Sequence, residues 1–389
     1  MSLTRPPAEF SALIAELRNF MDTVVIPSED LKTAHDGDAI NKQASELRVE
    51  ALKRGLRAPR RAVSDGGLGL SWEECCFFLE EAGRSFLGPT TLQCAAPGQP
   101  DIAALEKLAS PWQRERYLEP LARGDIRSCF AMTEPAPGAG SDPRMLKTTA
   151  TRTDSGWVIN GDKWFISGAV RADFAIVVAR SDAGVSWFLV DKSNPGFRVV
   201  RDIPTMEPFD AGGHGEIRLE NCKVGPQALV GEEGKGLEHA QLRLEGARLF
   251  HCMRWIGLSS RAMSVAQDYA AGRDSFGTRL SEHQMVQSMV ADAHISLYAA
   301  RLMTLDVARK LDRGESIRHE SSMAKVFVSE AVNKVADSAV QIAGAPGISE
   351  DLPLSMILRM LRPFRIYDGA SEVHRAAIAR RAFSKRLSA

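Results

Sequence analysis

Four short segments of this 389-residue chain combine residue types that could do chemistry. The first, residues 129–135, reads Cys-Phe-Ala-Met-Thr-Glu-Pro and leads into a glycine-rich stretch that ends at Ser141-Asp142. Glycine lets backbone N–H groups approach an anion closely, and hydroxyl groups add further donors. No Walker lysine follows, and the glycines do not join a strand to a helix as a dinucleotide fingerprint requires. Taken alone, this segment is better explained as a loop between two domains.

The other three segments also have ordinary structural explanations when each is taken alone. Residues 160–168 are predicted to form a hairpin that presents aromatic rings beside a hydroxyl group, but aromatic residues at strand spacing usually pack in a core. Residues 273–277, followed by His283-Gln284, fit the end of a helix with a glycine near its cap. Residues 341–347 form the last segment together with residues 365–375, in which Asp368 stands beside a glycine and before a helix, a usual place for a capping residue.

The composition excludes several classes of protein. Lys and Arg number 49 and so do Asp and Glu, which excludes a general polyanion binder and a disordered acidic protein. A local basic excess remains after Leu354, with eight Arg or Lys residues (359, 362, 365, 375, 380, 381, 385 and 386) against Asp368 and Glu372. The six cysteines are scattered without a Cys-x-x-Cys pair, which indicates thiols in a reducing compartment and no metal site. The chain shows no signal-peptide pattern and no apolar run of the roughly 20 residues that span a membrane, so we expect a cytoplasmic location without a membrane partner.

Three regions of different texture must position these segments. Residues 1–128 carry helical patterns, including a helix start at Ser71 with Glu74 three residues later. Residues 129–235 contain short β-branched and aromatic runs bounded by Gly, Asp or Pro, which predicts an antiparallel barrel or sandwich. Helical spacing returns after residue 235. The predicted fold class is α+β, with an N-terminal helical domain (1–128), a middle antiparallel β domain (129–235) and a C-terminal four-helix bundle (236–389) whose long helices cover about 240–271, 284–312, 318–342 and 371–386.

In this order, at these distances and on this layout, the segments resemble the acyl-CoA dehydrogenase family, from about Glu46 to Arg386. The shared motifs are Thr-Glu-Pro with Gly-Ser-Asp, Arg-x-x-Phe-Gly, Gln-x-x-Gly and Tyr-Asp-Gly-x-Ser. Lys163-Trp164-Phe165-Ile166-Ser167 corresponds to a Lys-x-Trp-Ile-Thr segment of the family, with Phe and Ser in place of Trp and Thr. A narrower similarity, in the Asp-Gly-x-x-Glu-Val-His motif and in residues 251–254, is to a subgroup that in animals is fused to a kinase-like domain.

The resemblance implies an FAD-dependent enzyme that removes two hydrogens from the α and β carbons of an acyl thioester. By motif match Asp368 takes the α-proton while the flavin accepts the β-hydride, and Arg248 lies near this base. Most members of the family have Glu at this position, and Asp is one methylene shorter. An apolar pocket would raise the pKa of the carboxylate toward a useful range, and the backbone N–H of Asp368 would polarise the thioester carbonyl.

The resemblance also assigns the cofactor contacts. Met132 and Thr133 match the pyrimidine edge of the flavin, Phe165 and Ser167 match its N5 side, and Ser141 matches a phosphate contact. Five further positions match residues that reach the FAD of a neighbouring subunit, which implies a homodimer or homotetramer, and two match the adenine side. These are Arg273, Phe276, Gln284, Gln341 and Gly344 for the neighbouring FAD, and Ser371 and Glu372 for the adenine. The basic excess after Leu354 would then meet the phosphates of FAD or CoA.

Alternatives remain open at this stage. A nitroalkane-oxidase-like flavoprotein would also use Asp as its base, and a DNA-binding flavoprotein would keep only the fold. The resemblance to the family implies fatty-acid oxidation with an electron-transfer flavoprotein as acceptor, and the subgroup suggests branched or hydroxylated acyl groups. His251 and Arg254 could line the acyl end. The carrier, CoA or an acyl carrier protein, is left undetermined.

Overall fold

The protein folds as two compact units. The structure is a computed structural model that describes residue 6, residues 10–209 and residues 212–387. Unit 1 takes the residues up to Cys94, Met206–Phe209 and the chain from Arg248 onward. Unit 2 takes Ala95–Thr205 and Asp210–Ala247.

Unit 1 is helical. The predicted helix start at Ser71 is confirmed, because the Ser71 hydroxyl accepts from Glu74 N (3.1 Å) while the Glu74 carboxylate accepts from Ser71 N (2.8 Å). The helices of unit 1 are α1 (Ser11–Phe20), α2 (Gly37–Lys53), α3 (Trp72–Ala82), α4 (Gly88–Thr91), the part of α8 (Gly236–Gly272) from Arg248 onward, α9 (Gln284–Asp312), α10 (Arg318–Ala343), α11 (Ala345–Ile348), α12 (Leu354–Leu361) and α13 (Ser371–Leu387), with the short strands β9 (Asp274–Ser275) and β10 (Thr278–Arg279).

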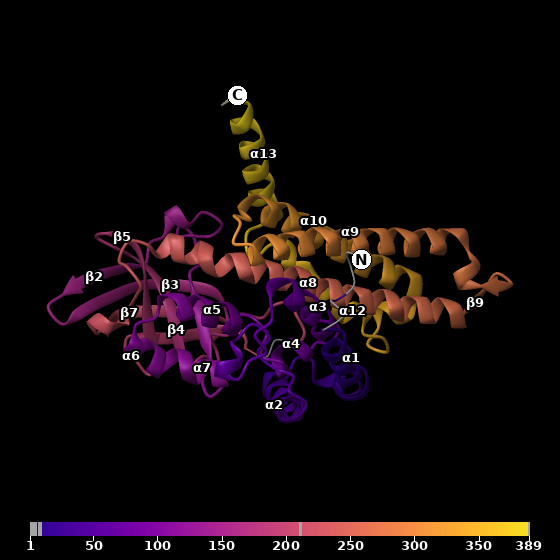
Figure 1. Cartoon of the computed structure of the whole chain (residues 1–389), viewed down its shortest axis with the longest axis horizontal. Coiled ribbons are helices and arrows are strands. Elements are labelled where there is room, and N and C mark those ends of the chain that lie inside the picture. The colour runs from indigo at the N-terminus through magenta and orange to yellow at the C-terminus, as the bar shows by residue number, and fades with distance from the viewer. Residues whose placement is uncertain (1–5, 7–9, 210–211, 388–389) are drawn as a thin grey trace. The chain divides into compact units, whose positions relative to one another are not determined.

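The four long predicted helices correspond to α8, α9, α10 and α13. Helices α9 and α10 are antiparallel neighbours, as Figure 1 shows, and ion pairs join them at Lys310–Glu320 (2.8 Å) and Lys334–Asp292 (3.8 Å). The buried residues of α10 recur at helical spacing, and α10 packs against α12 and α13. Asp312 at the end of α9 accepts hydrogen bonds from the first N–H groups of α3. These contacts build one helical core that holds the segment between α12 and α13.

Unit 2 is built on one eight-stranded sheet. Its order is β6-β7-β3-β2-β4-β5-β8, and β1 pairs with β4. The sheet is mixed rather than wholly antiparallel as expected, because β1 and the first residue of β2 both run parallel to β4. The strands are β1 (Ser128–Ala131), β2 (Thr149–Thr153), β3 (Gly156–Ser167), β4 (Phe174–Ser181), β5 (Gly184–Asp191), β6 (Phe197–Asp202), β7 (His214–Val224) and β8 (Leu229–Val230), and the helices are α5 (Gly98–Leu108), α6 (Pro111–Gln113), α7 (Glu119–Arg123) and the first turns of α8.

The first six residues of β4 are buried on both faces, which explains why residues 174–179 are continuously apolar. Ala175, Val177 and Ala179 face a core that also takes residues from β6 and β5, strands far apart in the sheet order. The sheet must therefore wrap around this core. The opposite side of β4 packs against α5 and α7.

Residues 160–168 do not form the predicted hairpin. They are the second half of β3, which pairs with β7 along its whole length but with register shifts between Ile159 and Gly161 and between Lys163 and Ile166. At the second shift Phe165 adopts a left-handed conformation (φ +50°). Such a bulge adds a residue on one strand and turns its side chain outward, so Phe165 is half-exposed although the strand continues.

All six cysteines are free thiols and are buried. In the described part of the chain, no helix is both long enough and apolar enough to cross a membrane.

Candidate active site

The predicted base, Asp368, lies in unit 1 on a turn between α12 and α13 with an unusual backbone. Asp368 has φ +55° and Gly369 has φ +95°. Glycine is required at 369, because a Cβ atom there would lie 2.7 Å from Nε2 of His374. A left-handed Asp is strained and persists only where surrounding contacts fix it.

Three side chains fix this turn by donating to its carbonyl oxygens. Arg248 Nε donates to Asp368 O (3.0 Å) and His374 Nε2 lies at the same distance from that oxygen. Lys325 Nζ donates to Gly369 O (2.6 Å). Arg248 is predicted to lie near the base. In the structure its side chain extends from α8 and contacts the main chain of Asp368. The helices α8, α10 and α13 each contribute one donor.

Burial sets the charge of two of these donors. Desolvation lowers the pKa of His374 to about 4, although its hydrogen bond to Asp368 O opposes the shift. His374 is therefore neutral near pH 7, and Nε2 must carry the proton because a carbonyl oxygen only accepts. Burial also lowers the pKa of Lys325 to about 8, while the Asp368 carboxylate favours the ammonium form. Lys325 keeps most of its charge at neutral pH although its side chain is fully buried.

The reactive groups of Asp368 itself are left unsatisfied. The carboxylate atom Oδ2 is buried and has no hydrogen-bond partner among the described residues, and the side chain is only 14% exposed. His251 Nε2 lies 3.4 Å from this oxygen. The Asp368 N–H donates no hydrogen bond within the described ranges. One residue thus offers a base and a backbone donor that could polarise a carbonyl.

Aromatic groups pack on His251, the imidazole beside this carboxylate. The rings of Tyr367 and Phe364 lie 5.0 and 6.0 Å from that of His251. Trp255 Nε1 donates to the Tyr367 hydroxyl (2.5 Å), and burial raises the pKa of Tyr367, so this hydroxyl stays neutral. The Arg254 guanidinium stacks on Trp255 at 3.8 Å. These side chains line the side of the base that faces α8.

In unit 2 a buried ion pair ties the Thr-Glu-Pro segment to β3. Glu134 accepts from Lys163 Nζ (2.9 Å), from Lys147 N (2.6 Å) and from Thr148 N (2.9 Å). Burial alone would raise the pKa of Glu134, but the Lys163 ammonium and these hydrogen bonds lower it to about 2. Lys163 also donates to Met132 O (3.0 Å), so the pair fixes the main chain beside the predicted flavin contacts.

Four of the predicted flavin contacts lie on these two joined segments. Thr133 exchanges two hydrogen bonds with Trp164, through its hydroxyl (2.7 Å) and through its carbonyl (3.1 Å). Met132 precedes it, and the bulge turns Phe165 outward next to Trp164. Ser167, two residues further along β3, hydrogen-bonds His214 across the strands (3.1 Å). Ser141 is exposed on the loop that closes on Glu134 through Ala139.

The five residues predicted to reach a neighbouring FAD gather at one end of the helical bundle of unit 1. Arg273, Phe276 and Gln284 are exposed on the β9–β10 hairpin and the first turn of α9, at the right-hand end in Figure 1. Gln341 and Gly344 are exposed at the end of α10, which the antiparallel pairing places beside the start of α9. Phe276 is 98% exposed at the hairpin tip.

The two predicted adenine contacts lie at the start of α13 but differ in exposure. Ser371 is buried and its hydroxyl is 3.4 Å from that of Ser329. Glu372 is exposed and its nearest cation is Arg375, at 4.0 Å. Of the basic residues after Leu354, Arg365 and Arg375 both pair with Glu330, at 2.9 and 3.5 Å.

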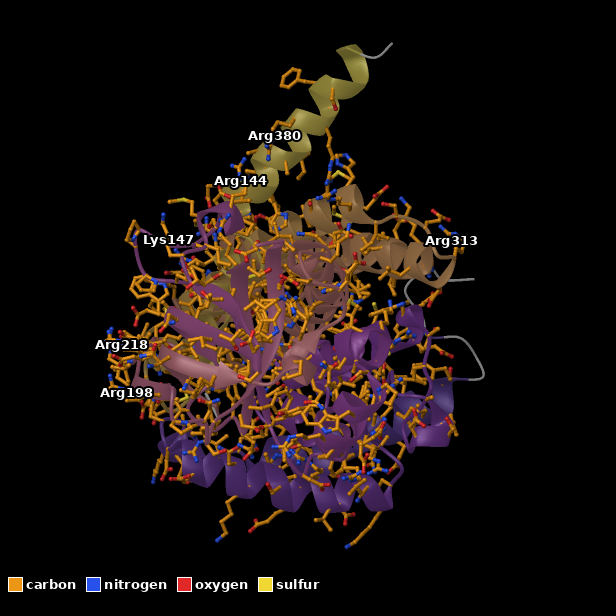
Figure 2. The ribbon with its side chains drawn as sticks, turned by 90° about the vertical axis from the view of Figure 1, so that its left-hand side faces the viewer. Arg144, Lys147, Arg198, Arg218, Arg313 and Arg380 are labelled. Atoms are coloured by element: carbon orange, nitrogen blue, oxygen red, sulfur yellow. The ribbon has the colours of Figure 1, made fainter. Side chains whose placement is uncertain are left out.

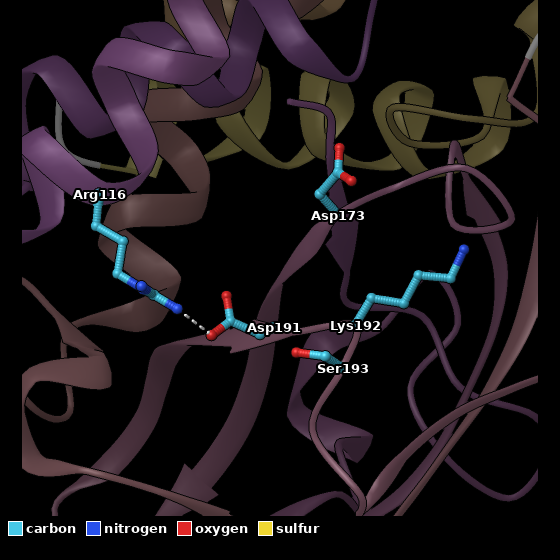
Figure 3. A pocket seen from close by; sticks show the side chains of 5 residues that line it. All are labelled: Arg116, Asp173, Asp191, Lys192 and Ser193. Carbon is cyan, nitrogen blue, oxygen red and sulfur yellow. Dashed lines mark hydrogen bonds and ion pairs between the residues drawn. The ribbon is translucent and has the colours of Figure 1, made fainter. Parts of the chain in front are cut away.

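A hollow in unit 2 is charged but satisfied by its own contacts (Figure 3). Arg116 pairs with Asp191 (2.7 Å), Asp173 accepts from Arg127 N (2.8 Å), and Lys192 donates to Val170 O (2.7 Å). Its charged side chains are thus engaged with one another or with the main chain.

Basic residues on the strands of unit 2 are largely neutralised. Arg198 and Arg218 stand opposite each other on β6 and β7 (Figure 2), and Arg218 pairs with Asp162 at 2.8 Å. Arg201 pairs with Glu216 (2.7 Å) and Arg144 with Asp142 (2.7 Å). This pairing does not favour the DNA-binding alternative.

Sequence reasoning missed the roles of Lys325, His374 and the Glu134–Lys163 pair. A signal existed for Lys325, which stands on the buried stripe of α10 with Ser321 and Val328, where an unpaired lysine is out of place. His374 and Lys163 belonged to recognised motifs, but the atoms they contact could not be inferred from spacing.

Comparison with known proteins gives the family. Three family models match consecutive parts of the chain: "Acyl-CoA dehydrogenase, N-terminal domain" at residues 7–125, "middle domain" at 129–222 and "C-terminal domain" at 234–383. A probable acyl-CoA dehydrogenase of Mycobacterium tuberculosis is 36% identical over 354 residues, which cover 88% of this chain and 86% of that protein. The chain belongs to the acyl-CoA dehydrogenase family. This confirms the family and the fold class expected from the sequence.

Two further similarities describe the extent of the match. A solved structure of a putative acyl-CoA dehydrogenase from Mycobacterium abscessus has a TM-score of 0.91 and 33% identity, and the match covers 98% of this chain and 100% of that one. Acyl-CoA dehydrogenase family member 11 of Mus musculus is 34% identical over 95% of this chain. The chain spans about half the length of that relative, since the match covers 49% of it.

Proposed function

We propose that the chain is an FAD-dependent acyl-CoA dehydrogenase in which Asp368 is the base. The observation that carries the proposal is the pair of unsatisfied groups on Asp368, a buried carboxylate oxygen and a backbone N–H. An acyl thioester supplies a partner for both, since its carbonyl oxygen accepts a hydrogen bond and its α-carbon carries a proton to be removed. Membership of the family supports the same assignment.

The chain's residues also fit FAD. The half-exposed ring of Phe165 and the segment of Met132 and Thr133 are held together by the buried Glu134–Lys163 pair, which suits a planar ring system. When bound, FAD would accept the β-hydride. Phe165, Ser167, Met132 and Thr133 would hold the flavin, and Ser141 a phosphate.

In the reaction, this chain's residues orient the thioester and hold the proton. The Asp368 N–H donates to the thioester carbonyl and so acidifies the α-carbon. The carboxylate removes the α-proton, while Arg248, His374 and Lys325 keep its turn in place. The aromatic wall of Tyr367 and Phe364 limits the access of water.

The finer parts of the proposal concern substrate and partners. Branched or hydroxylated acyl-CoAs are proposed because Arg254 stacks on Trp255 near the base with no acidic partner in the described ranges, and such a cation suits an oxygenated acyl group. An electron-transfer flavoprotein would take the electrons in the cytoplasm. The exposed cluster at the β9–β10 hairpin supports a homodimer or homotetramer in which Arg273, Phe276, Gln284, Gln341 and Gly344 complete the FAD site of a neighbouring subunit. Ser371 and Glu372 keep their proposed place on the adenine side.

Anaerobic bleaching of the flavin tests the proposal. The purified protein should be yellow, and a panel of acyl-CoAs that differ in length, branching and hydroxylation should bleach it. Nitroethane with oxygen serves as the second arm, because steady H₂O₂ release there without bleaching by any acyl-CoA would establish the nitroalkane-oxidase alternative instead. A flavin-free folded protein would refute both.

A further inference from the structure

His251 is held against the Asp368 carboxylate without a hydrogen bond to it. Nε2 lies 3.4 Å from Oδ2, and the two side chains are 10% and 14% exposed. A normal N–H···O hydrogen bond is about 2.7–3.2 Å long. The carboxylate form therefore has close contact with an imidazole nitrogen but gains no hydrogen bond from it.

The position of His251 is fixed from two sides. It lies one helical turn after Arg248, whose guanidinium donates to the main chain of Asp368 itself. On the other side its ring packs against those of Tyr367 and Phe364, on the segment that leads into the base. The spacing between imidazole and carboxylate is thus set by the same elements that place the base.

The other titratable and charged groups around this pair are engaged or neutral. Arg248, Lys325 and His374 donate to carbonyl oxygens of the turn. Burial raises the pKa of Tyr367, and it raises the pKa of Cys252 to about 12, so both keep their protons. Arg254 stacks on Trp255, and Glu207 lies on the Tyr367 side. Among the described groups, the His251 imidazole is the one placed at Oδ2.

We propose that His251 is the proton partner of Asp368, an inference that rests on the proposed function. When the α-carbon loses its proton, a C–H bond breaks and an O–H bond forms on Asp368. The protonated carboxyl group then donates to Nε2 of His251. The proton passes to the imidazole and on to water, which restores the carboxylate without any further reactant.

The placement brings a proton acceptor to the atom that receives the proton. Nε2 of a neutral imidazole can accept a proton from a carboxyl group, and it lies 3.4 Å from Oδ2, so a small approach of the two side chains brings them to hydrogen-bond distance. An imidazole titrates near pH 6.5 and can both accept and release a proton at neutral pH. Because His251 acts through Asp368, it is a positioning residue.

Exchange of the α-hydrogen with solvent tests this role. The holoenzyme is mixed anaerobically in D₂O with the acyl-CoA that bleaches it fastest, and deuterium at the α-carbon is measured by mass spectrometry beside the rate of bleaching. His251→Gln keeps a polar side chain but cannot carry a proton, and His251→Phe keeps an aromatic ring. His294→Gln, an exposed histidine on α9, is the matched control.

We expect the deuterium incorporated per bleaching event to fall about 10²-fold in both His251 variants, the lower end for a positioned proton-transfer group, while His294→Gln keeps the wild-type ratio. The proposal would be overturned if both His251 variants incorporated as much deuterium per bleaching event as the wild type. It would also be overturned if His251→Phe alone did so, because Phe cannot carry a proton. Absence of bleaching in the wild type would instead refute the proposed function.

Discussion

At the scale of single residues, Asp368 combines strain with fixation. A left-handed non-glycine residue costs about 1–3 kcal/mol, and here three donors from α8, α10 and α13 offset that cost. The carbonyl groups of the turn are thereby occupied, while the N–H and the carboxylate stay available. The left-handed backbone of Asp368 is therefore fixed by hydrogen bonds to the carbonyl groups of its turn, and its own N–H and carboxylate are left for a ligand.

Replacing Asp368 by Asn removes the base while keeping its shape. FAD content should stay normal, and anaerobic bleaching by acyl-CoA should slow by about 10²–10⁴-fold, as expected for loss of a general base. The flavin absorbance of the purified protein measures FAD content, and stopped-flow absorbance measures the rate of bleaching. Asp337→Asn, which changes an exposed carboxylate on α10, should bleach like the wild type. Unchanged bleaching in Asp368→Asn would remove this residue from the role.

His374 makes the turn sensitive to acid. Its pKa is about 4 in the folded protein against an ordinary 6.5, so the unfolded chain binds more protons between these values. Stability is fully present above pH 6.5 and falls as the pH drops toward 4, by about 2–3 kcal/mol at pH 4.5. Denaturant unfolding at pH 7 and pH 4.5 should show this loss in the wild type. His374→Gln should be less stable at pH 7 but should lose less on acidification, and an equal loss in both proteins would contradict the assignment.

At the scale of elements, the buried Glu134–Lys163 pair joins a loop to a bulged strand. It crosses between two segments that the sequence separates by 29 residues and that carry Met132, Thr133 and Phe165. Removing one partner leaves a charge buried without compensation, which is far more costly than the pair itself is stabilising.

Glu134→Gln should therefore destabilise unit 2 by about 3–5 kcal/mol, the range for breaking a buried ion pair. The double variant Glu134→Gln with Lys163→Met removes both charges but keeps an amide oxygen that can accept from Lys147 N and Thr148 N, and it should recover a large part of that loss. Denaturant unfolding measures the stability, and flavin absorbance after gel filtration measures retained FAD. If the single and double variants lose equal stability, the contribution of the pair is packing and not charge.

Local signals predicted the helices well. The capping pair Ser71 and Glu74 and the spacing of apolar residues depend on neighbours a few positions away, so the long helices agree with expectation. The bulge at Phe165 depends on pairing with β7, some 50 residues later, and the parallel pairing of β1 with β4 is equally remote. For the same reason the motifs indicated Asp368 and Arg248 but not the contacts of Lys325 and His374, which arise only once α10 and α13 pack together.

At the scale of the whole molecule, the proposed assembly concerns the exposed hairpin end of unit 1, where we expect cofactor retention to depend on a second subunit. Phe276 is almost fully exposed, and Arg273, Gln284, Gln341 and Gly344 are exposed around it. Exposed aromatic and arginine side chains that gather in one place are typical of contact surfaces.

Arg273→Ala should lower the FAD retained after gel filtration, because a cation that reaches the cofactor of a second subunit would be lost. The absorbance ratio of flavin to protein measures this, and sedimentation shows whether the assembly persists. Arg313→Ala, on the loop at the opposite end of α9, is the matched control. Normal FAD content in Arg273→Ala would count against a shared cofactor site.

The burial of all six cysteines has a practical consequence for such measurements. Desolvation raises the pKa of every one of these thiols, to about 12 for Cys94 and Cys252 and about 11 for Cys222, so almost no thiolate is present at neutral pH. The cysteines of the native protein should therefore react very slowly with maleimides and iodoacetamides. A single cysteine placed at the tip of the β9–β10 hairpin would be the one thiol to take up a fluorophore, so two labelled preparations could report by energy transfer when chains meet, without removing any native cysteine.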